Sequence, residues 1–265
     1  MRTPTAKTSL DLIFQVLPFL TVTILMVSFY FARIEESSAF NFSKEDGFLE
    51  WGTVFFFIYC ACLSVTILTI NELELSRSQK RFLAIFTLLL ILGIGEELSW
   101  GKRIIGWDVP AMVAETDGNL VQTDDTSLHN LRLKFSWGHV NPSDLVFSFF
   151  LPLGLLLQGI ILPWHLNRDN PRAKKIVAYW GFFVPSLKLG TLLFVCAFLF
   201  HRLKSFEGVT DVREYEEFII PFIFSFVMVD YYFKNSPRHW VFQGILIISV
   251  IFWLIASLFF FSHLP

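Results

Sequence analysis

Two adjacent glutamates, Glu96 and Glu97, are the residues of this sequence whose types and spacing most directly suggest chemistry. They follow the apolar run 82–95, and the string GEELSWGKR continues from them to Ser99 and Arg103. Ser99 and Arg103 come three and seven residues after Glu96, so on a helix these three residues share one face. Neighbouring carboxylates can share a proton or a divalent cation, which suits general acid–base catalysis. An arginine beside them suits a phosphate-bearing group.

Further acids recur where apolar runs begin. Glu50 is the last acid of EDGFLEW, and Glu217 is the last acid of REYEEF, so each lies nearest to the apolar run that follows it. We expect Glu50 and Glu217 to lie at the same depth as Glu96 and Glu97, forming one carboxylate-rich layer that could bind a divalent metal.

Asp125 and His129 are four residues apart in the long segment 104–143. On a helix this spacing lets a carboxylate and an imidazole share a metal, or lets the carboxylate fix one histidine tautomer for proton transfer. The same pair also fits a helix-capping acid and a surface histidine. As site residues, Asp125 and His129 are predicted metal ligands, and His129 is also a candidate proton carrier.

The same segment has apolar residues at helical spacing. Leu128, Leu131 and Phe135 recur at i, i+3 and i+7, which predicts a short amphipathic helix over 125–135. Such a helix would lie on the outer surface of the protein and cover the carboxylate layer.

Lys188 lies in the string FFVPSLKLGTLLF and is a cation in the middle of an apolar run. If that run is one helix starting at Ile176, a rise of about 1.5 Å per residue brings Lys188 close to the depth of Glu96. We expect an ion pair between Lys188 and Glu96 or Glu97, since a charge at this depth is costly without a partner. A purely structural ion pair that fixes helix packing fits the same pattern.

The elements that must position these residues are membrane spans. Of the 265 residues, 54% are hydrophobic and 17% charged, with 32 phenylalanines and a mean hydropathy of +0.57. A typical soluble domain is about a quarter charged, and runs of about 18 or more apolar residues suit a hydrocarbon core of about 30 Å. The sequence therefore predicts an all-α, polytopic transmembrane helical bundle.

We expect a single integral membrane domain over residues 1–265, with about seven spans. The predicted spans lie near 10–32, 49–70, 82–103, 144–162, 176–200, 214–233 and 240–262.

Orientation follows from the short loops, because lysine and arginine favour the cytoplasmic side. Cations gather in alternate loops: Arg2, Lys7, Arg77, Lys80, Arg81, Arg168, Arg172, Lys174, Lys175, Lys234 and Arg238. This predicts a multi-pass protein of the cell (inner) membrane, with a cytoplasmic N-terminus and the C-terminus outside. The expected partners are membrane lipids. A net charge of −2 gives no basic field for nucleic acid.

Three strings, EDGFLEW, GEELSWGKRIIG and NLVQTDDTSLHN, resemble those of a group of uncharacterised bacterial multi-pass membrane proteins. The resemblance covers roughly 45–135 and implies a membrane protein without implying an activity. A fainter likeness is to the membrane-embedded CAAX-type endopeptidases, which carry a double glutamate, an arginine and two later histidine motifs. Glu96 and Glu97 match the double glutamate, but the arginine is displaced to Arg103 and the histidine motifs are missing.

Three functions fit this pattern. The first is a membrane enzyme whose carboxylates open to the non-cytoplasmic face and act on a lipid or lipid-linked substrate, with Glu96, Glu97, His129 and Arg103 as catalytic residues. The second is a structural or assembly protein whose ion-pair cluster fixes packing. The third is a proton- or cation-coupled transporter. The third is disfavoured because the cytoplasmic half of the spans has few polar residues to continue a relay.

Overall fold

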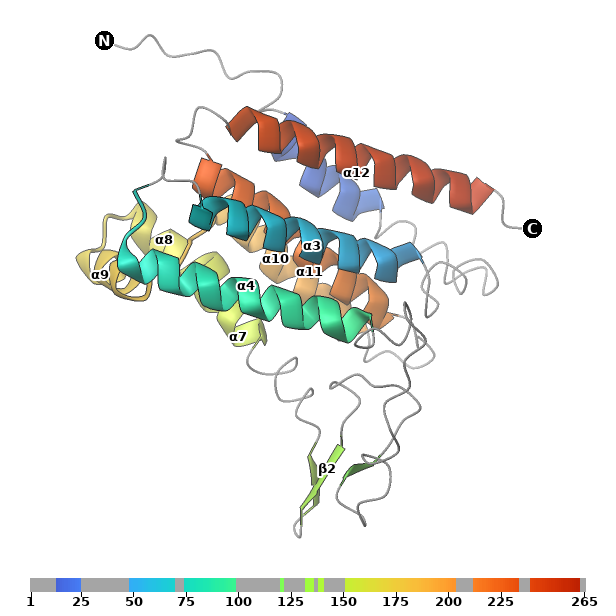
Figure 1. Ribbon diagram of the computed structural model, residues 1–265, viewed down its shortest axis with the longest axis horizontal. Coiled ribbons are helices and arrows are strands. Elements are labelled where there is room, and N and C mark those ends of the chain that lie inside the picture. The colour runs from blue at the N-terminus through green and yellow to red at the C-terminus, as the bar shows by residue number, and fades with distance from the viewer. Residues whose placement is uncertain are drawn as a thin grey trace.

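The computed structural model describes residues 13–24, 48–69, 74–98, 120–121, 132–135, 138–140, 151–203, 212–233 and 239–262. These residues are helical except for short connections and one small sheet (Figure 1). Two helices, α3 (Phe48–Thr69) and α4 (Arg77–Glu97), contain segments long and apolar enough to cross a membrane. Shorter apolar stretches lie at Ile13–Ile24 and within two further helices, α10 (Leu187–Leu203) and α12 (His239–Ser262).

α3 lies between α4 and α11 (Val212–Phe233) and packs on both. α3 and α11 run parallel, because Phe56 contacts Phe222 and, further along both helices, Ser64 contacts Met228. α10 packs on α11 as well, and α12 lies along the bundle beside them. The predicted spans 49–70, 214–233 and 240–262 match α3, α11 and α12 within two residues.

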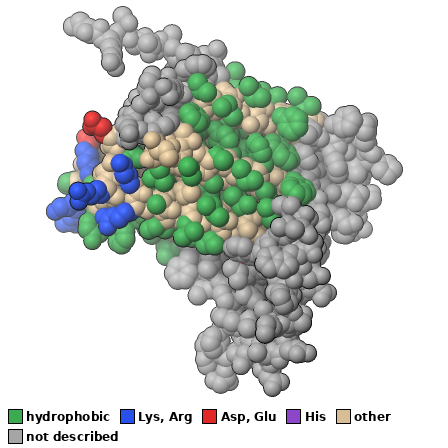
Figure 2. All heavy atoms as spheres, in the orientation of Figure 1, with side chains coloured by type: hydrophobic (Ala, Val, Ile, Leu, Met, Phe, Trp, Pro, Cys, Tyr) green, Lys and Arg blue, Asp and Glu red, His purple; other side chains and the backbone are tan. Residues whose placement is uncertain are grey.

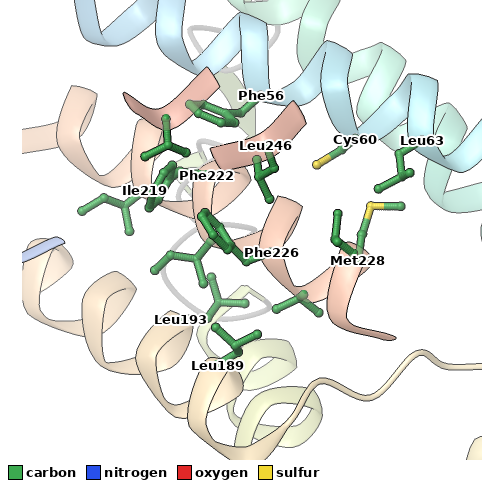
Figure 3. Packing of buried hydrophobic residues seen from close by; sticks show 14 of the residues in the cluster. Phe56, Cys60, Leu63, Leu189, Leu193, Ile219, Phe222, Phe226, Met228 and Leu246 are labelled. Carbon is green, nitrogen blue, oxygen red and sulfur yellow. The ribbon is translucent and has the colours of Figure 1, made fainter. Parts of the chain in front are cut away.

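Phenylalanine rings lie among aliphatic side chains in the core between α3 and α11 (Figure 3). The centroid of the Phe56 ring is 5.2 Å from that of Phe222, with the rings nearly perpendicular. Phe222 in turn lies 5.3 Å from Phe226, which contacts Phe14 of the Ile13–Ile24 helix at 5.1 Å. Edge-to-face contacts of this kind are the arrangement that aromatic rings prefer. This chain of rings joins three helices that are distant in the sequence.

α4 starts and ends earlier than the predicted span 82–103. Ser76 caps its first turn: the Ser76 hydroxyl accepts a hydrogen bond from the Gln79 backbone, and the Gln79 side chain accepts one from the Ser76 backbone. The helix ends at Glu97, and Leu98 is its C-cap. The prediction that this helix continues to Arg103 was therefore wrong. The Ser76 cap starts the helix at Arg77, before the apolar run begins. At about 1.5 Å per residue, the 21-residue helix is therefore already about 31 Å long at Glu97.

The predicted span 144–162 is described from residue 151 onward, as three consecutive helical elements. These are α7 (Leu151–Leu156), the π-helical turn η5 (Leu157–Ile161) and α8 (Leu162–Asn167). Pro163 explains the π turn, because proline has no N–H to donate to the carbonyl of Gly159 four residues earlier. The Gly159 carbonyl instead lies against Gly190 of α10. A Cβ added at Gly190 would be only 2.0 Å from the Gly159 carbonyl oxygen.

The predicted continuous span 176–200 was also wrong. α9 (Pro171–Trp180) ends at Gly181, whose φ of 73° is left-handed and favours glycine. Pro185 keeps the preceding residue out of the helical region, and the Ser186 hydroxyl then accepts a hydrogen bond from Leu189 N at the start of α10.

The break between α9 and α10 is held inside the bundle. The Gln158 side-chain amide donates a hydrogen bond of 2.8 Å to the carbonyl of Phe183, and the fully buried Phe183 ring meets Phe82 and Phe86 of α4 edge-on. These contacts satisfy and pack the non-helical backbone between the two helices. Lys188 consequently belongs to the first turn of α10, so the depth estimated from an unbroken helix does not apply to it.

A three-stranded antiparallel sheet interrupts the otherwise all-helical fold. It consists of β1 (Leu120–Val121), β2 (Arg132–Phe135) and β3 (Gly138–Val140), with Leu133 paired to both Leu120 and Val140. The amphipathic helix predicted over 125–135 is therefore wrong for Arg132–Phe135. The string LRLKF alternates apolar and polar residues, which is the strand period, and this alternation overrides the helical spacing of its leucines.

Candidate functional site

The carboxylates predicted to form a site come from helix ends that lie together. α3 and α11 run parallel, and an added Cβ at Gly52 would be 2.5 Å from the Phe218 ring. Glu50 and Glu217, which closely precede these two residues, therefore share one end of the bundle. α4 runs the opposite way to α3, and its Gly93 meets the Phe57 ring. The end of α4 with Glu96 and Glu97 thus lies at the same end (Figure 1). We call Glu50, Glu96, Glu97 and Glu217 the acidic end.

Burial differs among these four side chains. Glu50, in the first turn of α3, is 7% exposed, whereas Glu96, Glu97 and Glu217 are half-buried. Each of the four makes a hydrogen bond or another electrostatic interaction. A buried carboxylate must be compensated by such partners. The position of Glu50 in the first turn adds favourable interaction with the N-terminal end of the helix dipole.

Other predicted site residues are placed elsewhere or not described. Lys188 has an exposed side chain in the first turn of α10. A pairing of Lys188 with Glu96 or Glu97 stays a prediction. Arg103, Asp125 and His129 lie outside the described residues.

The metal hypothesis depends on those undescribed residues. Among the residues that the structure describes, no three His, Cys, Asp or Glu side chains are grouped so as to hold a metal ion. A metal site at the acidic end that includes Asp125 or His129 stays a prediction, since both residues lie outside the described part of the chain.

Several small polar side chains are buried among the helices beyond the acidic end. Thr53, Ser64 and Ser225 are fully buried, but Thr53 and Ser225 hydrogen-bond within their own helices, and Ser64 contacts the sulfur of Met228. The transporter hypothesis stays a prediction.

The opposite end of the bundle is strongly basic, as Figure 2 shows. Seven exposed cations gather there, and we call them the basic end: Arg77, Lys80, Arg81, Arg168, Arg172, Lys174 and Lys175. The start of α4 and the end of α9 meet at Ser78 and Gly181. A Cβ added at Gly181 would be 2.4 Å from the Ser78 backbone. These cations were predicted to lie in loops, but all of them except Arg168 belong to α4 or α9.

Between the two ends the exposed surface is apolar (Figure 2). α4 exposes Ile85, Leu88 and Leu89, with Ile85 at 61%, and α12 exposes Ile248 at 69% and Phe252 at 66%. An apolar helix whose hydrophobic residues point away from the core is untypical of a water-exposed protein surface.

Comparison with known proteins gives no further identification. The chain matches no protein-family model, and no curated protein or solved structure is significantly similar to it. The two charged ends and the apolar surface between them are therefore the features that indicate the class of protein.

Proposed function

We propose that this chain is a multi-pass integral membrane protein whose acidic end acts on a lipid or lipid-linked substrate at the non-cytoplasmic face. The observation that carries the proposal is the distribution of surface chemistry. Cations occupy one end of the helices, carboxylates occupy the other, and the exposed surface between them is apolar.

The apolar surface supports membrane insertion. α3 and α4 are long enough to cross a hydrocarbon core of about 30 Å. Only 17% of the apolar window of α4 is buried inside the protein, so most of its hydrophobic residues need another apolar environment. Lipid tails supply one. The remaining apolar helices, with α10 beginning after the break at its N-terminal side, complete the spans in this proposal.

The basic end supports an orientation. Lysine and arginine in short connections favour the cytoplasmic side, and the connections 74–76 and 168–170 adjoin this end. We therefore place the basic end in the cytoplasm and the acidic end at the opposite interface.

The acidic end supports acid–base chemistry. Glu96 and Glu97 are half-buried in the last turn of α4, where a substrate at the interface can reach them, and Glu50 is buried at the same end. One carboxylate can accept a proton while its neighbour donates one. In this proposal His129 carries the proton away, and Arg103 binds a phosphate-bearing head group.

The test is a lipid-turnover experiment with Glu96→Gln and Glu97→Gln. Purified protein is incubated with a total membrane lipid extract, and lipid species are compared by mass spectrometry. We expect the wild type to deplete one lipid class and to form a product, and each variant to lose at least about 100-fold of that rate, as removal of an acid or base catalyst does.

Glu74→Gln is the matched control, because Glu74 is an exposed glutamate near the basic end. This variant should retain the wild-type lipid profile. Identical profiles for wild type, Glu96→Gln and Glu97→Gln would contradict the enzymatic proposal.

One observation favours a structural role instead. None of Glu50, Glu96, Glu97 and Glu217 lacks an interaction partner, which is what a cluster that fixes helix packing requires. A structural role predicts that Glu96→Gln and Glu97→Gln lower the midpoint of thermal unfolding without changing any lipid. The enzymatic role predicts that both variants lose lipid turnover and keep the wild-type midpoint of thermal unfolding.

A further inference from the structure

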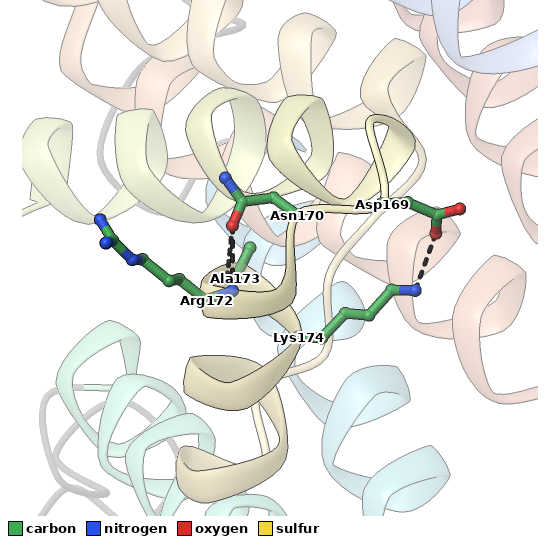
Figure 4. Close-up of polar contacts among 5 residues, drawn as sticks. All are labelled: Asp169, Asn170, Arg172, Ala173 and Lys174. Atoms are coloured by element: carbon green, nitrogen blue, oxygen red, sulfur yellow. Dashed lines mark hydrogen bonds and ion pairs between the residues drawn. The ribbon is translucent and has the colours of Figure 1, made fainter.

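The basic end has no part in the proposed acid–base chemistry, yet it concentrates charge on one surface. Its seven cations face two exposed carboxylates, Glu74 and Asp169. The Lys174 ammonium is 2.7 Å from the Asp169 carboxylate and lowers the pKa of that carboxyl, mainly through their hydrogen bond (Figure 4). Since both side chains are exposed, this pair adds little stability. Because the cations outnumber these two carboxylates, the basic end keeps an excess of positive charge.

α9 gives this surface a defined shape. Asn170 caps the helix by accepting hydrogen bonds from the backbone of Arg172 and Ala173 (Figure 4). Ala173 is buried against the bundle, so the opposite side of α9 is open. Two further side chains of α9 are exposed: Ile176 and Tyr179, the latter at 73%.

Aromatic rings border the cations. Trp180, at the end of α9, is exposed. The Arg168 guanidinium lies over the exposed ring of Trp164 in α8, 3.8 Å from the ring centre. Cations beside exposed tryptophan and tyrosine are typical of a helix that lies at a membrane interface, with its rings at headgroup level.

We infer that the basic end is a binding surface for anionic phospholipid headgroups, with α9 lying in the interface of the cytoplasmic leaflet. The inference rests on the proposed membrane insertion and orientation. Charge complementarity identifies the occupant: the cations attract phosphate, and exposed aromatic and aliphatic side chains of the same helix need acyl chains. A nucleic acid or an acidic protein would match the cations but not the apolar residues between them.

The test uses the full chain reconstituted in phosphatidylcholine vesicles. A small, equal fraction of either brominated phosphatidylglycerol or brominated phosphatidylcholine is added, and quenching of tryptophan fluorescence is measured. Anionic lipid that gathers beside Trp164 and Trp180 should quench more than its bulk fraction predicts. We expect a local enrichment of at least about twofold, since each lysine or arginine near the surface attracts anionic lipid.

The variant Arg172→Gln, Lys174→Gln, Lys175→Gln should quench equally with both brominated lipids. The matched control, Arg172→Lys, Lys174→Arg, Lys175→Arg, keeps every charge and should retain the excess quenching by phosphatidylglycerol. Equal quenching of the wild type by both lipids, or an excess that survives in the glutamine variant, overturns the inference and leaves the surface to an acidic protein or nucleic acid. If neither brominated lipid quenches, the protein is not inserted, and the proposed function itself fails.

Discussion

Gly190→Ala is expected to destabilise the protein strongly, by overpacking the crossing of η5 and α10. The new Cβ would lie 2.0 Å from the carbonyl oxygen of Gly159 and 2.7 Å from its carbon, and both atoms belong to the backbone. That carbonyl belongs to the η5 backbone and lacks its usual α-helical donor, because Pro163 has no N–H. No side-chain rotation relieves this contact, so we expect a loss of about 3 kcal/mol, at the upper end for overpacked sites.

Gly154→Ala is the control, since an added Cβ there meets nothing within 4 Å. Gly154 lies in α7, on the same helical segment as Gly159. It should be neutral or slightly stabilising, because alanine favours a helix by up to about 1 kcal/mol over glycine. The measurement is the temperature at which half of the detergent-solubilised protein loses its monodisperse elution peak. Equal midpoints for Gly190→Ala and Gly154→Ala would show that η5 and α10 do not cross at this contact.

Phe222→Ala is expected to have a comparably large effect. The Phe222 side chain is 1% exposed, and its ring lies between those of Phe56, Phe218 and Phe226 at centroid distances of 5.2, 5.7 and 5.3 Å. Within a membrane, helix association depends on such van der Waals packing. Truncation leaves a cavity at the junction of α3 and α11, and a loss of about 3 kcal/mol is expected.

Phe252→Ala removes the same ring from an exposed position. Phe252 is 66% exposed on α12, and the change should alter the thermal midpoint little, since scattered surface positions contribute within about 0.5 kcal/mol. The comparison is made in the same detergent by the same elution assay. A Phe252→Ala variant as unstable as Phe222→Ala would mean that α12 is buried on the side that the structure exposes.

The helices also show where sequence reasoning succeeded and where it stopped. Hydropathy predicted the location of α3, α11 and α12 well, because long apolar runs are needed at those positions whatever their packing. It missed the break between α9 and α10, since an apolar segment such as FFVPS satisfies hydropathy whether or not it is helical. Gly181 and Pro185 were the available signals for this break.

For the site, depth was predictable from sequence only roughly. The shared level of Glu50, Glu96, Glu97 and Glu217 follows from the alternation of spans, and the parallel course of α3 and α11 agrees with it. The direction of each side chain depends on helix rotation, which apolar runs do not encode. For the same reason the burial of Glu50, deeper than that of the other three, was not predictable.

The helix predicted over 125–135 was wrong for Arg132–Phe135 for another reason. Leu128, Leu131 and Phe135 fit helical spacing, but Leu133 completes an alternation that fits a strand equally well. A pattern this short fits both the helical spacing and the alternation of a strand. The hydrogen-bonded pairing of β2 with β1 and β3 selects the strand.

Cysteine accessibility tests the central claim, that the apolar surface between the two charged ends lies in a membrane. In a chain with Cys60, Cys62 and Cys196 replaced by alanine, single cysteines are placed at Lys80, Leu88 and Asp117. A membrane-impermeant maleimide is then applied to intact cells, to permeabilised cells and to detergent-solubilised protein.

Lys80 is exposed at the basic end, Leu88 is exposed on the apolar face of α4, and Asp117 belongs to the predicted outer loop. The account predicts that Asp117→Cys reacts in intact cells, Lys80→Cys only after permeabilisation, and Leu88→Cys only after detergent, because hydrocarbon shields it. Ready labelling of Leu88→Cys before detergent would show that water covers this face. That result, or labelling of Lys80→Cys and Asp117→Cys from the same side, would contradict the account.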